Sequence, residues 1–390
     1  MQVVGMGADG WVGMGERERS IVQTATVVLG GPRHLDLLPD VPGQRRIPWP
    51  TPLRDGLPGL VATLDGPVVA LASGDPLLAG IGSTLVEVLG EEAVTVIPAV
   101  SSVALARARM GWAAETTEVL RDAGTLVRHL APSRRILLLS SDGSTPARVA
   151  EMLRDQGFGA SRLTVLANLG ADDESTHTTT AEGWAGDAPP LHVLAIECAG
   201  FLPHGLLAGL PDDAFEHDGQ LTKRDVRASA LARLAPQPGQ LLWDIGAGAG
   251  SVAIEWLRAH TTCRAVAVEQ SVARAERIAR NSVSLGVPSL RVVVGSAPGA
   301  LAGLPAPNAV FVGGGATTPG LLEACWSALA PDGRLVIHGV TMETEVVLAQ
   351  WYADHRGELV RLSVEHASPL GDFTGWTPAR TVTQWAGRKS

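Results

Sequence analysis

LLWDIGAGAGS, residues 241–251, is the stretch that decides the fold of this chain. A run of apolar residues holds one acid, Asp244, near its end, and a glycine-rich turn then leads into a helix-like segment. Glycine lets the backbone turn tightly and approach a ligand that a Cβ atom would block. Taken alone, such a turn could serve only to pack a helix onto a sheet. It predicts a strand, a tight turn and a helix of an α/β domain.

A second acid favours a ligand site at this turn. Glu269 ends the next apolar run, 265–269, about 20 residues beyond the glycines, where a carboxylate can bind both hydroxyls of a ribose. On its own, Glu269 could be a solvated acid at the end of a strand. The turn and the acid together predict a nucleoside-binding site.

The spacing of the glycines separates two classes of nucleoside cofactor. Gly246, Gly248 and Gly250 follow the pattern GxGxG and not GxGxxG, and Asp244 precedes them closely. A dinucleotide places its pyrophosphate on the amino terminus of the helix, which a nearby acid disfavours, whereas a methionyl ammonium group tolerates an acid. The sequence therefore favours S-adenosylmethionine.

Two further glycine-containing loops follow later strands of the same series. Residues 295–298 (GSAP) come after the apolar run 291–294, and residues 313–316 (GGGA) come after 308–312. Each could be an ordinary loop if judged alone. Because ligands of open α/β folds bind at the carboxyl ends of parallel strands, we expect the three loops to converge on one crevice.

The whole chain reads as two α/β domains. Its 390 residues exceed what one hydrophobic core usually supports. Short apolar runs alternate with helix-like segments up to residue 200, which predicts mostly parallel strands. The pattern breaks at 201–215, which predicts a linker, and restarts over 216–390. The expected strands are 26–29, 68–72, 94–97, 135–139 and 191–196, then 240–245, 265–269, 291–294, 308–312 and 334–340, and the expected helices of the second domain are 223–234, 252–259, 273–285, 320–329 and 343–354.

Composition excludes several classes of protein. The net charge of −9 disfavours a nucleic-acid binder, which needs a basic face for phosphates. The three cysteines form no CxxC pair, so we expect reduced thiols and no metal site. The start of the chain lacks the features of a signal peptide, and no apolar run is long enough to span a membrane. These features predict a cytoplasmic protein without a membrane partner.

Three short motifs mark the first domain, and each of them is weak alone. Residues 3–10 (VVGMGADG) read as a strand and a glycine-rich turn, and residues 73–76 (SGDP) join an apolar run to a helix-like segment. Ser101 and Ser102 precede a third helix-like segment. A Gly-Asp-Pro sequence is more often a plain turn, and a serine pair is more often a helix cap.

In their order and spacing, these three motifs resemble the tetrapyrrole methylases of the CbiE type over residues 1–200. The resemblance implies two α/β lobes, about 1–98 and 99–200, with S-adenosylmethionine in the cleft between them. Gly7 would face the tetrapyrrole, and Asp9 is a weak candidate for a proton acceptor whose alternative is a solvated loop acid. The residues implied to line the cofactor cleft are Gly74, Asp75, Ser101, Ser102 and Ala195, with a weaker contribution from 168–170.

The second domain resembles the CbiT-type precorrin methyltransferases over residues 210–390. The landmarks appear in order at 221–227, 243–251, 295–298, 313–315 and 340–344. The resemblance implies a Rossmann-like class I methyltransferase domain. The residues implied to contact the cofactor are Thr222, Gly246, Ala247, Gly248, Ala249, Gly250, Glu269 and Ala297.

The paired resemblances imply a bifunctional enzyme of cobalamin biosynthesis. The carboxyl-terminal domain would methylate carbon 15 of a precorrin and remove carbon dioxide from the acetate at carbon 12, and the amino-terminal domain would methylate carbon 5. Each domain would hold one S-adenosylmethionine, and no metal is expected. The resemblance to CbiT-type proteins also implies a homo-oligomer.

The many carboxylates of such a substrate require cationic partners. The candidates are Lys223, Arg224 and Arg227 beside the second site and Arg107, with Arg109, beside the first. Each of these could instead be an exposed helix charge. Four readings stay open: a cobalt-containing precorrin as substrate, a nucleotide-dependent oxidoreductase, a chain in which one domain is a catalytically silent binding module, and a methyltransferase for RNA or a small molecule.

Overall fold

The computed structural model describes residues 1–201 and 205–389 in two compact units. The first comprises Met1–Ala123 and Leu130–Phe201, and the second comprises Gly124–His129 together with the described residues beyond Phe201. Residues 202–204 of the predicted linker lie outside the described residues. Each unit is considered by itself below.

The first unit begins with a parallel five-stranded sheet in the order β3-β2-β4-β1-β5. Its central strands are buried on both faces, which explains their continuous apolar sequence. Because the strands are parallel, the turns after β1, β2 and β4 emerge at one edge. The bounds are β1 Gln2–Met6, β2 Val27–Gly30, β3 Arg45–Pro48, β4 Val68–Ser73, β5 Thr95–Ile97, α1 Gly10–Gly13, α2 Glu16–Thr24, α3 Pro32–Asp36, α4 Leu53–Val61 and α5 Ile81–Leu89.

The second sheet of this unit has the order β6-β7-β10-β8-β9 and is mixed. Only β6 and β7 pair in parallel, because β10 runs antiparallel to both of its neighbours and β9 runs antiparallel to β8. The expectation of mostly parallel strands is therefore wrong here. The bounds are β6 Thr117–Leu120, β7 Arg135–Leu139, β8 Arg162–Ala167, β9 Ser175–Thr180, β10 His192–Glu197, α6 Ser102–Met110 and α8 Thr145–Asp155, while α7 Leu126–His129 is grouped with the second unit.

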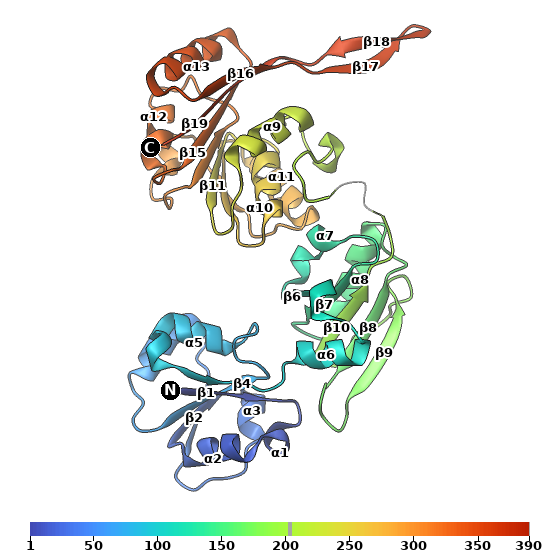
Figure 1. The fold of residues 1–390 in the computed structure, drawn as a ribbon, viewed down its shortest axis with the longest axis vertical. Coiled ribbons are helices and arrows are strands. Elements are labelled where there is room, and N and C mark those ends of the chain that lie inside the picture. Colours follow the sequence, from blue (N-terminus) through green and yellow to red (C-terminus); the bar gives the residue numbers. More distant parts are fainter. Residues whose placement is uncertain (202–204, 390) are drawn as a thin grey trace. The chain divides into compact units, whose positions relative to one another are not determined.

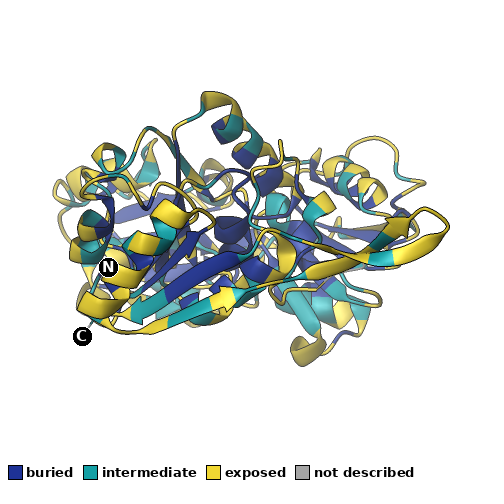
Figure 2. Ribbon diagram, turned by 90° about the horizontal axis from the view of Figure 1, so that it is seen from above, coloured by how far each residue is buried: buried dark blue, intermediate teal, exposed yellow. Residues whose placement is uncertain are grey.

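The second unit is built on a seven-stranded sheet in the order β13-β12-β11-β14-β15-β19-β16. The first five strands are parallel, and β19 runs antiparallel to β15 and β16. Helices cover both faces, so the inner strands are buried, whereas the edge strands β13 and β16 are only partly buried. In Figure 2 buried strands are dark blue and exposed helix faces are yellow. The bounds are β11 Leu241–Ile245, β12 Arg264–Glu269, β13 Arg291–Val294, β14 Ala309–Val312, β15 Arg334–Gly339, β16 Glu358–Leu362, β19 Val382–Arg388, α9 Arg224–Leu234, α10 Ser251–Ala259, α11 Val272–Ser284, α12 Leu321–Ala328 and α13 Met342–His355.

This arrangement is the Rossmann-like α/β architecture expected for the second domain. The predicted strands and helices up to residue 354 are found within a few residues of their expected bounds. Phe311 on β14 and Trp256 on α10 are almost fully buried in one of the two cores. Burial of such a side chain stabilises the fold by about 1.5–3 kcal/mol.

A hairpin arm leaves the sheet after β16 and returns to it at β19. It consists of β17 (Glu365–Leu370) and β18 (Phe373–Pro378). Figure 1 shows the arm, in red, extending away from the seven-stranded sheet. Leu370, Phe373 and Trp376 are among its exposed side chains. The sequence pattern predicted neither the arm nor the strands that flank it.

Candidate active site

A cavity of about 1300 Å³ opens at the carboxyl edge of the parallel strands in the second unit. The three glycine-containing loops, at 246–248, 295–297 and 313–315, all line it. Glu269, at the end of β12, lines the same cavity. The expected convergence of the loops on one crevice is therefore present in the structure.

The glycine-rich loop has a backbone that side chains would disturb. Gly246 and Gly248 have φ values of 68° and 61°. A Cβ atom on Gly248 would lie 2.7 Å from the carbonyl oxygen of Gln220, so a side chain would push two backbone segments apart. Gly246, Ala247 and Gly248 line the cavity.

The last two residues of the loop lie behind the cavity. Ala249 is fully buried, and a Cβ atom on Gly250 would lie 2.8 Å from the side chain of Ile278. These two residues turn the chain into α10 and pack it against α11. The structure therefore places Ala249 and Gly250 among the packing residues and not on the cavity wall.

Glu269 is held in place by the loop that it faces. One carboxylate oxygen accepts a hydrogen bond from the backbone N–H of Gly248 at 2.9 Å, and the other accepts from Ser271 at 2.9 Å. Each oxygen keeps a second lone pair for a ligand hydroxyl. The side chain is only 3% exposed, so it is a preorganised acceptor at the cavity wall.

Asp244 lies one layer below the loop. It is 1% exposed, and one oxygen accepts a hydrogen bond from the backbone N–H of Ala253 at 3.0 Å. The other oxygen has no hydrogen-bond partner within the described residues. Burial, with a smaller contribution from Glu269, raises the pKa of Asp244 to about 7. The acid that favoured a sulfonium cofactor in the sequence therefore titrates near neutral pH, and it does not line the cavity.

Asp244→Asn is expected to remove a pH-dependent loss of stability. The pKa of Asp244 rises from 3.8 to about 7 on folding. The protonated side chain therefore contributes fully to the unfolding free energy below the unfolded pKa, and this contribution is lost as the pH rises through the folded pKa. Asparagine keeps an oxygen for Ala253 and cannot ionise. The variant should therefore lose less unfolding free energy than the parent between about pH 4 and pH 8. Denaturant titrations across this range measure the slope, and equal slopes would contradict the assignment.

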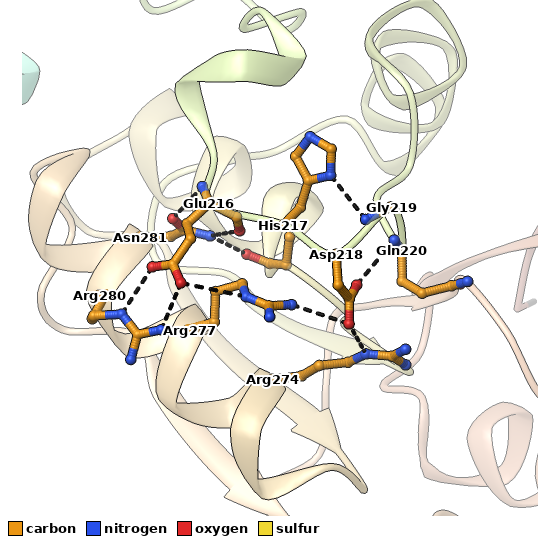
Figure 3. A network of polar contacts seen from close by, with 10 residues as sticks. Glu216, His217, Asp218, Gly219, Gln220, Arg274, Arg277, Arg280 and Asn281 are labelled. Carbon is orange, nitrogen blue, oxygen red and sulfur yellow. Dashed lines mark hydrogen bonds and ion pairs between the residues drawn. The ribbon is translucent and has the colours of Figure 1, made fainter.

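A strap of five residues, Glu216 to Gln220, lies across α11 (Figure 3). Its last residue, Gln220, lies beside Gly248 of the glycine-rich loop. Glu216 pairs with Arg280 at 2.7 Å and with Arg277 at 3.6 Å. Asp218 pairs with Arg274 at 2.9 Å and with Arg277 at 3.2 Å. The Arg274 hydrogen bond, followed by the backbone N–H of Gln220, lowers the pKa of Asp218.

The strap leads directly into the cavity wall. Asn281 fastens its first residue, because its side chain both accepts from and donates to the backbone of Glu216, each at 2.9 Å. Gln220 and Thr222 then line the cavity, as does Ala297 on the GSAP loop. The predicted residues Thr222 and Ala297 therefore lie beside the glycine-rich loop.

Two of the three predicted cations of the second unit lie at the cavity. Lys223 and Arg224 line it, and both are exposed at the start of α9. Lys223 also lies 3.5 Å from Asp212. The sequence did not single out four further basic residues of the cavity: Arg274, His338, His366 and Arg380.

Arg227 does not reach the cavity, which corrects its predicted role in substrate binding. Its side chain is 0% exposed and pairs with Glu255 at 2.6 Å and with Asp212 at 3.3 Å. It also donates to the backbone carbonyl oxygens of Leu210 and Thr222. Arg227 thus holds the segment before α9 onto the core, and its donors are committed within the protein.

The first unit brings its predicted cofactor residues together at the edge of its parallel sheet. The backbone N–H of Gly74 donates to Met6 at 2.8 Å, and Ala99 donates to the carbonyl oxygen of Gly74 at 3.1 Å. Gly74 has a φ of 53°, and a Cβ atom on it would lie 3.0 Å from the Cα atom of Ser101. The turn after β4 and the segment before α6 are therefore in close contact.

The side chains around this turn have local partners. Asp75 accepts a hydrogen bond from the backbone N–H of Leu77 at 2.9 Å, and Ser101 caps α6 by accepting from Ala104 at 3.1 Å. Ser102 is exposed at the first turn of α6. Ala195 differs, since it is 1% exposed within the core of the second sheet. Its methyl group packs inside the protein and does not face a ligand.

The predicted tetrapyrrole-facing turn closes around Asp9. A Cβ atom on Gly7 would lie 2.4 Å from a carboxylate oxygen of Asp9, and a Cβ atom on Gly13 would also collide with that carboxylate. Asp9 itself is exposed. The carboxylate therefore packs over two glycines at the end of β1.

The cations predicted beside the first site behave differently. Arg107 is partly exposed on α6 and has no ion pair within the described part of the chain. Arg109 forms a two-pronged pair with Glu174, at 2.5 and 3.0 Å. Glu174 also accepts from the backbone N–H of Gly170, so this pair closes the 168–170 loop against α6.

Three other features bear on the kind of site present. In residues 1–201 and 205–389, no group of three or more His, Cys, Asp or Glu residues could hold a metal ion. The same residues contain no helix long and apolar enough to cross a membrane. The three cysteines are buried and unpaired.

Two protein families match separate parts of the chain. Residues 2–184 match the tetrapyrrole (corrin/porphyrin) methylases, and residues 213–389 match the precorrin methyltransferase domain. Both resemblances drawn from the motifs are thereby confirmed. The fold and the two family matches together define the class of protein. It is an S-adenosylmethionine-dependent methyltransferase with two methylase domains in one chain.

Relatives that match over the full length narrow this class. The precorrin-6Y C(5,15)-methyltransferase (decarboxylating) of Sinorhizobium sp. is 45% identical over 399 residues, covering 100% of this chain and 96% of that relative. The protein of the same name from Mycobacterium tuberculosis (strain CDC 1551 / Oshkosh) is 46% identical over 389 residues, 98% of each chain. The chain belongs to the family of decarboxylating precorrin-6Y C(5,15)-methyltransferases.

A solved structure covers part of the chain. The C-terminal domain of precorrin-6Y C5,15-methyltransferase from Rhodobacter capsulatus is 45% identical to this chain, with a TM-score of 0.46. The aligned region spans 48% of this chain and 100% of the chain in that structure.

Proposed function

We propose that this chain methylates a metal-free precorrin at carbons 5 and 15 and decarboxylates the acetate at carbon 12, with one S-adenosylmethionine bound in each domain. The second unit would carry out the carbon-15 methylation and the decarboxylation, and the first unit would methylate carbon 5. The observation that carries the proposal is the cavity in which Glu269 and the glycine-rich loop stand side by side. The named function of the full-length relatives supports it.

The residues of this cavity fit a nucleoside with a sulfonium side chain. Gly246 and Gly248 let the ligand approach the backbone, and the Glu269 carboxylate has lone pairs for the two ribose hydroxyls. Ala297 and its neighbours offer a small wall for the base. The proposed contacts are Thr222, Gly246, Ala247, Gly248, Glu269 and Ala297.

The reaction requires the protein to position the cofactor and the substrate and to enclose them. When bound, S-adenosylmethionine supplies the methyl group by an in-line displacement at its sulfonium. The electron-rich ring carbon is the nucleophile, so no side-chain nucleophile is required, and alignment of the two reactants accounts for much of the rate. Decarboxylation leaves an electron pair that the protonated conjugated ring can accept.

The carboxylates of the ring need cationic partners at the mouth of the cavity. Lys223, Arg224 and Arg380 line it and are exposed, so they can turn toward an anionic ligand. In the first unit we assign Gly74, Asp75, Ser101 and Ser102 to the second cofactor site and Gly7 and Arg107 to the tetrapyrrole. Asp9 stays a weak candidate for the proton acceptor there. Homo-oligomerisation, a cytoplasmic location and the absence of a nucleic-acid partner remain predictions.

The direct test is a reaction with product mass as the readout. Purified full-length protein, S-adenosylmethionine and the reduced hexamethylated precorrin should yield a product that has gained two methyl groups and lost one carbon dioxide. A parallel reaction with the cobalt-containing substrate distinguishes the two substrate classes. Faster turnover of the cobalt form would reject the metal-free assignment, and an unchanged mass in both reactions would reject the proposed function.

A further inference from the structure

His338 combines deep burial with a place on the cavity wall. It lies on β15, it is 6% exposed, and it lines the cavity at the side of β14 and β15. The edge of its ring meets Phe311 with the ring centroids 4.9 Å apart. Nothing in the mechanism above uses this side chain.

A chain of hydrogen bonds behind His338 fixes which ring nitrogen carries the proton. Gln384, its antiparallel partner on β19, has its amide 2.8 Å from Nε2. The other end of that amide faces Arg233, at 3.0 Å from Nε and 3.3 Å from Nη1. Because a guanidinium group only donates, the amide oxygen must face Arg233 and the amide nitrogen must face His338.

The Arg233 end of this chain is itself anchored. Its guanidinium group donates to Glu358 at 2.9 Å and to the hydroxyl of Ser229 at 2.8 Å. The amide of Gln384 is therefore held between a fixed cation and the imidazole. Nε2 of His338 accepts from that amide, so the proton of the neutral ring sits on Nδ1.

The ring stays neutral in this setting. Burial, followed by the charge of Arg233, lowers the pKa of His338 to about 4. Within the described residues, Nδ1 has no hydrogen-bond partner. His338 is thus an uncharged donor on the wall of a cavity whose exposed side chains include Lys223, Arg224 and Arg380.

The position of His338 in the sheet points to the substrate and not to the nucleoside. Glu269 ends β12, which lies on one side of β11, and His338 lies on β15, on the other side of β11. Next to His338 the wall continues through β16 and the base of the arm, with Val364, His366 and Arg380. This end of the cavity is the one left for a large anionic ring.

We infer that His338 donates a hydrogen bond from Nδ1 to the substrate carboxylate that leaves as carbon dioxide. The inference rests on the proposed function. A neutral donor orients that carboxylate without giving it a counter-ion, and a counter-ion would stabilise the ionised acid more than the transition state, in which its charge moves into the ring. The bond from the acetate methylene carbon to the carboxyl carbon breaks, carbon dioxide departs, and the electron pair enters the protonated ring.

Two uncharged variants of nearly equal size test the inference. His338→Asn places an amide where Nδ1 stands, and His338→Gln places an amide where Nε2 stands. In single-turnover reactions of the full-length protein, the Gln variant should decarboxylate about 10- to 100-fold more slowly and accumulate product that is methylated but still carries the acetate. The Asn variant should retain most of the decarboxylation rate. Affinity for S-adenosylhomocysteine should stay unchanged in both.

The outcomes separate this inference from the function on which it rests. Equal rates in the two variants, whether both are fast or both are slow, would overturn the role of Nδ1, because a merely structural histidine does not distinguish the two amides. A parent protein that yields no methylated product would instead reject the proposed function.

Discussion

Gly248→Ala is expected to abolish carbon-15 methylation and decarboxylation. Its Cβ atom would lie 2.7 Å from the carbonyl oxygen of Gln220, and its φ of 61° is unfavourable for any residue with a side chain. The strap and the glycine-rich loop must separate, and the hydrogen bond from the Gly248 N–H to Glu269 is displaced with them. Affinity for S-adenosylhomocysteine in the second unit should fall by at least about tenfold, which corresponds to about 1.4 kcal/mol. Calorimetry measures the affinity, and mass spectrometry the product.

Gly303→Ala is the matched control for Gly248→Ala. Gly303 also has a positive φ, 76°, but no atom lies within 4 Å of the position its Cβ would take. It bears the same backbone strain without the collision. Equal losses of affinity in the two variants would contradict the role assigned to the contact with Gln220.

The same logic applied to Gly74 tests the division of labour between the units. A Cβ atom at Gly74 would lie 3.0 Å from the Cα atom of Ser101 and 3.1 Å from the carbonyl oxygen of Val100. The Gly74→Ala variant should keep carbon-15 methylation and decarboxylation and lose carbon-5 methylation. Loss of the same methyl group in the Gly74 and Gly248 variants would reject the assignment of one methylation to each unit.

Arg227→Met is expected to cost about 3–5 kcal/mol of unfolding free energy in the second unit. Arg227 is 0% exposed, and its removal leaves Glu255, which is 3% exposed, as a buried carboxylate without its cation. The carbonyl oxygen of Leu210 also loses its donor. Methionine fills most of the volume, so the loss reports the ionic and polar contacts. Denaturant unfolding of the full-length protein, followed as separate transitions for the two units, measures it.

Arg388→Met provides the comparison for Arg227→Met within the same unit. Arg388 pairs with Asp332 at 3.1 Å, but both side chains are about 70% exposed, which limits such a pair to about 0–1 kcal/mol. If the two variants lost equal amounts of unfolding free energy, burial would not be the cause of the difference argued here.

The prediction that Arg227 binds the substrate is wrong, although the sequence contains the pattern that indicates its burial. Arg227 was grouped with Lys223 and Arg224 as a cation beside the site. At helical spacing, however, it shares a face with Ala230, Leu231 and Leu234, all of which are buried. A cation within an apolar helical stripe is more simply explained as one half of a buried ion pair.

The glycine-rich loop and Glu269 could be predicted because both are local. A strand, a tight turn and an acid at the end of the next strand lie within one βαβ unit, and the parallel topology then dictates where they meet. His338 and Gln384 depend instead on the register between β15 and β19, which are antiparallel and far apart in sequence. No periodicity within either strand reveals which residues will face each other.

The first unit shows the same contrast between local and distant contacts. Gly74 and Ser101 meet because parallel strands end at one edge, as their motifs predicted. Ala195 was carried over from a family resemblance, yet the antiparallel pairing of β10 on both sides places its methyl group inside the core. The strand order of this sheet depends on pairing between segments that are distant in sequence, and a local sequence pattern does not predict such pairing.

The arm formed by β17 and β18 is inserted where the chain would otherwise need only a short reversal. Leu362, the last residue of β16, already pairs with Val382, the first residue of β19, so the sheet is complete on either side of the insertion. This projection can therefore change in length or surface without disturbing the pairing of β16 with β19. Among the described residues, only its root, which contributes His366 and Arg380 to the cavity, ties the projection to the chemistry.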